Sequence, residues 1–329
     1  MELIANYNPI DMIQDTLKVT KKSSSNFIEA NTQKVSLEHL KNDCVIPVFS
    51  KDNESTISHF QFIDKAYEVV QKLFPEIEVD LPDIRVSHVI KGRIPSAVGK
   101  PAKELLQHEK TIYYERCAFL IELPSIREVV NGNELNLSVG GVRSYNQENL
   151  YSKKSLEKFK VFIGFKNRVC TNLCISTDGF SNEIRIGSIL DMEQRMEQLF
   201  EGYDRERHLG MMKRLGSYKL SEQQFAHFIG KLRMYPYLDK MEQRGVFPVT
   251  LNDSQINNVV KEYYVGQNFS RSPDGSINLW KLYNMFTEAN KSSYIDNNFE
   301  RNVNAFELVN NLGISIENNT PNWLLHNLL

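Results

Sequence analysis

The segment from Tyr145 to Arg168 holds the residue types best suited to contact a polyanion. Its cationic side chains are Lys153, Lys154, Lys158, Lys160, Lys166 and Arg168, against only Glu148 and Glu157. Its aromatic side chains are Tyr145, Tyr151, Phe159, Phe162 and Phe165. Single-stranded nucleic acid needs cations for its phosphates and flat rings on which its bases stack. The segment therefore predicts a nucleic-acid surface, with single-stranded DNA as the favoured ligand.

The same segment also fits a half-buried strand. In the run Phe159-Lys160-Val161-Phe162-Ile163, strand alternation would merely put lysine outward and phenylalanine inward. Tyr145 and Tyr151 are freer of this objection because they flank an expected loop. On the nucleic-acid reading the lysines and Arg168 hold phosphates, and one of the two tyrosines stacks on a base.

A glycine pair precedes this segment, in Gly140-Gly141-Val142-Arg143. Paired glycines allow another backbone or a ligand to come close. Arg143 would then offer its guanidinium to a phosphate at the floor of the groove. The alternative is a β-bulge, with Arg143 held in a structural ion pair.

A C-terminal helix, expected over 277–290, carries two stripes. The first is an ordinary apolar face formed by Leu279, Leu282, Tyr283 and Phe286. The second joins an aromatic ring to polar groups and consists of Trp280, Asn284, Thr287 and Lys291. We expect Trp280 to pack on the sheet, and Asn284 and Thr287 to bond strand backbone, as buried polar groups generally find partners. A binding site on this stripe is the alternative.

Catalytic and cofactor motifs are missing from the sequence. Cys170 and Cys174 fall in an expected strand, too far apart to chelate one ion, and are interpreted as small buried residues. No nucleotide-binding loop, nucleophile elbow or paired histidine motif occurs, so we expect no cofactor and no resident metal. Dispersed carboxylates leave a metal-dependent nuclease as a third possibility, with Glu115, Glu122, Asp178 and Glu183 as the candidate ligands.

Composition indicates a globular protein without strong global attraction to polyanions. The 329 residues carry a net charge of −2 and are 41% hydrophobic. Neither an export signal nor an apolar run of membrane-spanning length is seen. We expect a cytoplasmic protein with reduced cysteines and no membrane contact.

The elements that must position these residues form two blocks. Alternating segments at 84–90, 113–123, 135–145, 159–165 and 168–176 predict strands, and Asn131-Gly132 predicts a hairpin. Helices are expected at 58–74, 189–200, 205–215, 221–234, 253–263, 277–290 and 299–310, with a short one at 101–108. Strands followed by helices predict an α+β fold with a mostly antiparallel sheet. Expected parts are an N-terminal arm (1–55), a sheet core (56–187) and a helical block packed on it (188–329).

Several short motifs resemble one family. They are Arg85-Val86-Ser87-His88, Gly92-Arg93-Ile94-Pro95, Tyr113-Tyr114-Glu115-Arg116, Gly140-Gly141-Val142-Arg143, Asn149-Leu150-Tyr151, Phe162-Ile163-Gly164-Phe165, Val169-Cys170-Thr171-Asn172-Leu173-Cys174, Leu279-Trp280-Lys281-Leu282-Tyr283-Asn284 and Lys291-Ser292-Ser293-Tyr294-Ile295-Asp296. From about residue 80 to the C-terminus, the chain resembles the domain-of-unknown-function family 3871 of Bacteroidetes and their mobile elements. More loosely, it is similar to the phage and plasmid-like family 932. The resemblance implies a gene of a phage, plasmid or integrative element and transfers no catalytic residue.

Two main functions follow. The first is a DNA-handling protein of a mobile element, which binds or anneals single-stranded DNA without catalysis and works as a homo-oligomer. The second is a protein-interaction factor, such as an inhibitor of host defence or a replication accessory, with a host protein as its partner.

Overall fold

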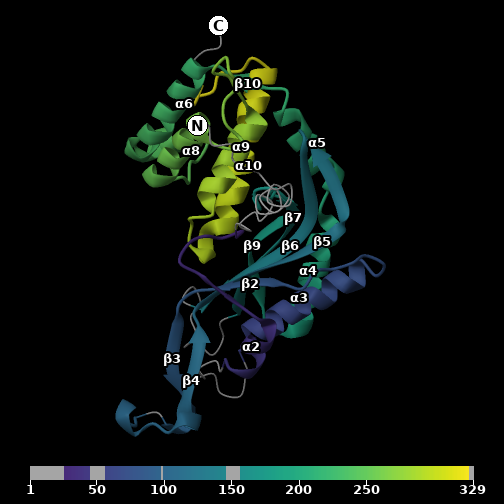
Figure 1. The fold of residues 1–329 in the computed structure, drawn as a ribbon, viewed down its shortest axis with the longest axis vertical. Helices are drawn as coiled ribbons and strands as arrows, with labels where there is room; N and C mark the ends of the chain where they lie inside the picture. Colours follow the sequence, from purple (N-terminus) through teal and green to yellow (C-terminus); the bar gives the residue numbers. More distant parts are fainter. Residues whose placement is uncertain (1–25, 45–55, 98, 146–155, 326–329) are drawn as a thin grey trace, which may run out of the picture.

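A computed structural model describes residues 26–44, 56–97, 99–145 and 156–325. Its centre is a curled antiparallel sheet in the order β1-β2-β5-β6-β7-β8, with β9 also paired to β7 (Figure 1). These strands are β1 (Gln33–Val35), β2 (Asp83–Val86), β5 (Arg116–Val130), β6 (Asn133–Ser144), β7 (Glu157–Asn167), β8 (Leu173–Cys174) and β9 (Phe180–Ile186). The sheet, followed by helices, confirms the predicted α+β fold.

The longest strands form the hairpin β5–β6. Asn131 and Gly132 both have positive φ, at 48° and 82°, which suits the tight turns that match strand twist. The predicted hairpin is therefore confirmed. The β5–β6 pairing is regular at Gly140 and Gly141. The register shift between these two strands lies elsewhere, between Leu123 and Arg127 of β5. The predicted bulge at the glycine pair is wrong.

The glycine pair instead makes room for aromatic rings on both faces of the sheet. A Cβ added at Gly140 would collide with the ring of Phe162, and one at Gly141 would collide with the rings of Phe62 and Phe119. All three rings are buried. The close approach predicted from the two glycines is thus made by core side chains.

Helices cover both faces of the sheet. They are α2 (Leu37–Asn42), α3 (His59–Leu73), α4 (Ile189–Gly202), α5 (Arg205–Leu215), α6 (Glu222–Met234), α7 (Lys240–Arg244), α8 (Asp253–Val265), α9 (Leu279–Asn290) and α10 (Ile295–Glu317). Helices α3 and α4 pack together against β5, β6, β7 and β9. The start of α10, with Phe27 and Ile28, covers alternate residues of the same strands on the opposite face. A small ladder, β10 (Lys219–Leu220) with β11 (Ile277–Asn278), lies within the helical region.

Most predicted helices are confirmed to within a few residues, and their ends follow capping chemistry. Ser58 and Ser221 both cap helices through reciprocal capping boxes. Residues 26–44 of the predicted N-terminal arm contribute β1 and α2 to the fold. Among the described helices, no segment combines the length and the hydropathy of a membrane span.

Three local predictions are wrong. The expected strand at 84–90 is two strands, because β2 ends at Val86 and β3 (Val89–Arg93) belongs to another sheet. The short helix expected at 101–108 is two 3-10 turns, Ala102–Glu104 and Gln107–Glu109. The strand expected at 168–176 begins as a turn in which Thr171 has a φ of 58°, so only β8 remains extended there.

Strands β3 and β4 (Lys110–Tyr114) form a separate two-stranded ribbon. The ribbon projects away from the sheet and the helical block (Figure 1). A third 3-10 turn, Pro95–Ala97, also lies between its strands. The ribbon therefore presents its surface on an arm and not on the body of the protein.

Candidate nucleic-acid interface

Arg143 lies inside the protein. Its side chain has no exposed surface, and its guanidinium forms an ion pair with Glu157 and donates to the backbone carbonyl of Ile57. The guanidinium also lies over the ring of Phe159, 4.4 Å from its centroid. Arg143 is thus a structural ion-pair residue, as the alternative interpretation of its motif predicts. In this fold it cannot form the floor of an open groove.

Tyr145 is also buried, at 2% exposure. Its ring packs against that of His59 in a tilted arrangement, with centroids 4.5 Å apart, and lies under the guanidinium of Arg143 at 4.6 Å. Burial and the nearby Arg143 charge lower the pKa of His59 to about 3, so the imidazole is neutral at physiological pH. In this conformation the ring of Tyr145 is unavailable for stacking on a base.

The cations of β7 and the following turn each meet a carboxylate. The pairs are Lys158 with Glu183, Lys160 with Glu300, Lys166 with Glu122, and Arg168 with Glu134. Lys160 also donates to the backbone carbonyl of Asp296 on α10. These bonds link the strand to neighbouring elements and reduce the charge left for phosphates. Tyr151, Lys153 and Lys154 lie outside the described residues, so their role stays a prediction.

The ribbon brings together cations that sequence reasoning missed. Directly opposed residues of an antiparallel pair share one face, and the register pairs Arg93 with Lys110 and Lys91 with Ile112. Lys91, Arg93 and Lys110 therefore lie on the same face of the ribbon. Lys91 and Lys110 are exposed. Within the described part of the chain, none of the three forms an ion pair.

The opposed pair Arg93 and Lys110 is electrostatically unfavourable in the protein alone, because like charges directly across a ladder repel. The nearby acid Glu109 does not relieve it, since that carboxylate is bound by Lys100, which lowers its pKa. In the sequence, the spacing of Lys91 and Arg93, two residues apart, could have indicated a cationic face on one strand. Their pairing with Lys110 could not be inferred, because seventeen positions separate Arg93 from Lys110.

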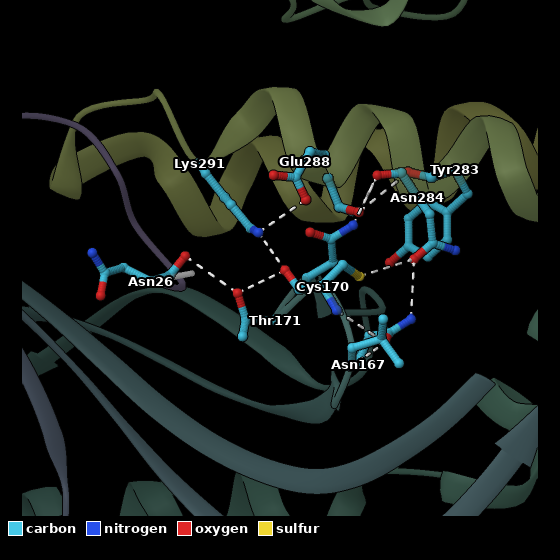
Figure 2. A network of polar contacts seen from close by, with 11 residues as sticks. Asn26, Asn167, Cys170, Thr171, Tyr283, Asn284, Glu288 and Lys291 are labelled. Atoms are coloured by element: carbon cyan, nitrogen blue, oxygen red, sulfur yellow. Dashed lines mark hydrogen bonds and ion pairs between the residues drawn. The ribbon is translucent and has the colours of Figure 1, made fainter. Parts of the chain in front are cut away.

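The polar stripe of α9 faces the turn between β7 and β8 (Figure 2). Lys291 is only 2% exposed, and its ammonium bonds the carbonyl of Cys170 and the carboxylate of Glu288. Asn172 of the turn donates to the backbone carbonyl of Asn284 at 2.9 Å. The stripe therefore anchors the helix to a turn whose backbone would otherwise be buried without partners.

The hydrogen bonds of the Asn284 and Thr287 side chains differ from those predicted for this stripe. The Asn284 side chain donates to Trp280 O of its own helix, and accepts from Asn167 and from the Cys170 thiol. Thr287 donates only within α9, to the carbonyl of Asn284 at 3.1 Å and of Tyr283 at 3.3 Å. The prediction that both residues bond strand backbone is thus wrong.

Trp280 joins the helix to the sheet. It is 1% exposed, and its Nε1 donates to Asn133 Oδ1 at 2.7 Å. Asn133 is the first residue of β6, so the bond reaches the end of the central hairpin. This geometry matches the expected packing of Trp280 on the sheet.

The carboxylates considered for a nuclease have separate partners. Glu122 pairs with Lys166, Glu183 with Lys158 and Arg185, and Asp178 accepts from the amide of Asp204. Among the residues that the structure describes, no group of three or more His, Cys, Asp or Glu side chains could hold a metal ion. We therefore assign no metal role to them.

Comparison with protein families identifies the chain's relatives. A family model described as "Domain of unknown function, B. Theta Gene description", DUF3871, matches residues 10–325. The chain belongs to the DUF3871 family. The match confirms the resemblance inferred from the motifs and extends it into the N-terminal region. Searches of curated proteins and of solved structures found no match for this DUF3871 chain.

Proposed function

We propose that this protein is a DNA-handling protein that grips the phosphate backbone with the β3–β4 ribbon. The observation that carries the proposal is the face formed by Lys91, Arg93 and Lys110 on a projecting arm. Phosphate contacts of this kind supply most sequence-independent affinity for DNA. A net charge of −2 on the whole chain makes such a local cationic surface the place where DNA would bind.

The shape of the ribbon favours double-stranded DNA. The major groove admits a two-stranded β-ribbon, and several DNA-binding proteins use strands in this way. Bringing phosphates beside Arg93 and Lys110 would also remove their mutual repulsion. Single-stranded DNA, favoured from the basic and aromatic segment, stays a prediction that the same experiment tests. A place in a mobile element follows from the family resemblance and stays a prediction too.

Fluorescence anisotropy with labelled duplex and single-stranded oligonucleotides, at two salt concentrations, tests the proposal. The variant Lys91→Ala/Lys110→Ala removes two exposed cations of the ribbon. The matched control Lys240→Ala/Lys261→Ala removes two exposed lysines of α7 and α8. We expect only the ribbon variant to bind DNA weakly. In a plot of log Kd against log salt concentration, the slope for this variant should be smaller by about two.

Three results would contradict the proposal. They are no binding of either DNA at low salt, equal weakening by the control variant, and unchanged binding by the ribbon variant. Tighter binding of single strands by wild-type protein and ribbon variant alike would point instead to the segment that contains Tyr151, Lys153 and Lys154.

A protein-interaction role is the second candidate, and one surface favours it. Three large side chains are exposed where α6 leads into α7: Met234 at the end of α6 at 55%, Tyr237 in the 3-10 turn Tyr235–Tyr237 at 87%, and Met241 in α7 at 81%. Exposed apolar patches on soluble proteins often mark contacts with other proteins. A stoichiometric partner from host lysate that is retained by wild type and lost by Tyr237→Ser/Met241→Ser would support this role. If wild type and the variant retain the same partner equally, this surface is not the site of the interaction.

A further inference from the structure

A cavity of about 240 Å³, whose lining includes Met211 beside polar and charged side chains, lies between the β8–β9 connection, α5 and α10. Ser176, Thr177 and Asp178 line it from the connection, and Arg207 lines it from α5. Glu307 and Asn310 close it from α10. The cavity lies on the body of the protein, away from the projecting ribbon, and none of its lining residues is used by the proposed DNA contact.

Charged side chains of both signs line the cavity. Arg207 is exposed and forms no ion pair with any described residue. Asp178 accepts one hydrogen bond, from the amide of Asp204 at 3.2 Å. Glu307 accepts one, from the Thr177 hydroxyl at 2.7 Å. Two carboxylates and one guanidinium leave the site with one excess negative charge.

A buried hydroxyl also lines the cavity. Ser176 is 1% exposed, and its Oγ has no hydrogen-bond partner within the described chain. Buried polar atoms are nearly always hydrogen-bonded in native proteins, so an unpartnered hydroxyl at a cavity wall is open to a water molecule or a ligand. The Asn310 side chain is likewise without a hydrogen bond to any described residue, and offers both donors and an acceptor.

We propose that this cavity binds a free basic α-amino acid, of the class that includes lysine, ornithine and arginine. Arg207 would receive the α-carboxylate, for which a guanidinium is the best matched side chain. Asp178 and Glu307 would receive the α-ammonium and the side-chain cation, while Ser176 and Asn310 complete the hydrogen bonds. The net charge of +1 on such a ligand complements the net charge of −1 of the site. Ligand pockets for drug-sized molecules are larger, at roughly 300–1,000 Å³, which favours a small ligand here.

Isothermal titration calorimetry of the full chain with L-lysine tests the proposal. L-norleucine is the matched ligand control, since it keeps the chain length and lacks the terminal ammonium. Nα-acetyl-lysine amide distinguishes a free amino acid from a lysine side chain within a peptide, because it lacks both α-charges. The variants are Arg207→Gln and Glu307→Gln. Arg205→Gln, on the same helix and paired with Glu206, is the matched protein control.

We expect wild type and Arg205→Gln to bind L-lysine equally, and each of the other two variants to bind about tenfold to a hundredfold more weakly. Norleucine and the acetylated amide should bind weakly or not at all. Absence of binding by L-lysine, ornithine and arginine would overturn the proposal. So would equal binding of norleucine or of the acetylated amide, or an unchanged affinity in Arg207→Gln. Arg207 is exposed, so its variant tests the site even if Glu307→Gln unfolds.

Discussion

Replacing Arg143 with methionine tests whether its guanidinium belongs to the fold or to a ligand site. The side chain is fully buried, and that of its partner Glu157 is only 8% exposed. Removal of one member of a buried ion pair leaves an uncompensated charge and costs about 3–5 kcal/mol. The Ile57 carbonyl also loses its guanidinium donor, which adds about 1 kcal/mol. We expect the free energy of unfolding to fall by about 4–6 kcal/mol.

The double variant Arg143→Met/Glu157→Leu is the matched control. It removes both charges, and apolar residues of similar size often replace a buried ion pair without loss. The backbone amide of Ile57, which donates to Glu157 at 3.1 Å, still loses its acceptor. We therefore expect the double variant to regain about 2–3 kcal/mol relative to Arg143→Met, and not to reach wild-type stability.

Urea unfolding followed by circular dichroism measures these differences, and anisotropy with labelled DNA is read under conditions where every variant is folded. The reasoning predicts lost stability and unchanged DNA affinity. It is refuted if Arg143→Met unfolds within about 1 kcal/mol of wild type while its DNA affinity falls, because the guanidinium would then be acting on the ligand.

Three further predictions follow from the core. Trp280→Ala removes a buried ring and its bond to Asn133, and should lower the free energy of unfolding by about 3–5 kcal/mol in urea titration; a folded variant that loses only binding would make the α9 stripe a site. Gly140→Ala places a Cβ against the ring of Phe162 and 2.6 Å from a backbone oxygen, so the thermal midpoint should drop by the equivalent of about 1–3 kcal/mol. An unchanged midpoint would show that the rings can move. Burial lowers the pKa of both His59 and His208 to about 3, whereas the unfolded chain takes up these protons near 6.5. Stability should therefore be complete above pH 6.5 and fall as the pH drops toward 3, and His208→Asn should reduce the slope by about 1.4 kcal/mol per pH unit. A slope unaltered by this variant, measured as unfolding free energy at several pH values, would contradict burial of a neutral imidazole.

Local patterns in the sequence were sufficient for most individual elements. Alternation of apolar residues, the Asn131-Gly132 turn and the serine caps act between neighbours in the chain, so the hairpin β5–β6 and most helices could be predicted. The misjudged strand at 168–176 has the same composition as a true strand. There, bonds of the turn to Lys291 and Asn284, more than a hundred positions away, decide the conformation.

The candidate site depended much more on the tertiary structure. Lysines of β7 are cationic in any reading of the sequence, but their carboxylate partners come from other elements, such as Glu300 of α10. The glycines next to Arg143 predict a guanidinium that a ligand can reach, whereas the fold buries Arg143 in an ion pair with Glu157. Burial and ion pairing depend on which distant segments meet, which composition and spacing do not encode.

By itself, the sequence determined the α+β class, the family and the local chemistry of turns and caps, because these depend on residue types at short spacing. Only the tertiary structure decided which cations stay without a carboxylate and which hydroxyl is buried without a partner. It did so by the register that sets Arg93 opposite Lys110, and by bringing Ser176, Arg207 and Glu307 around one cavity. Long-range packing selects these neighbours, and their charge and burial follow from it.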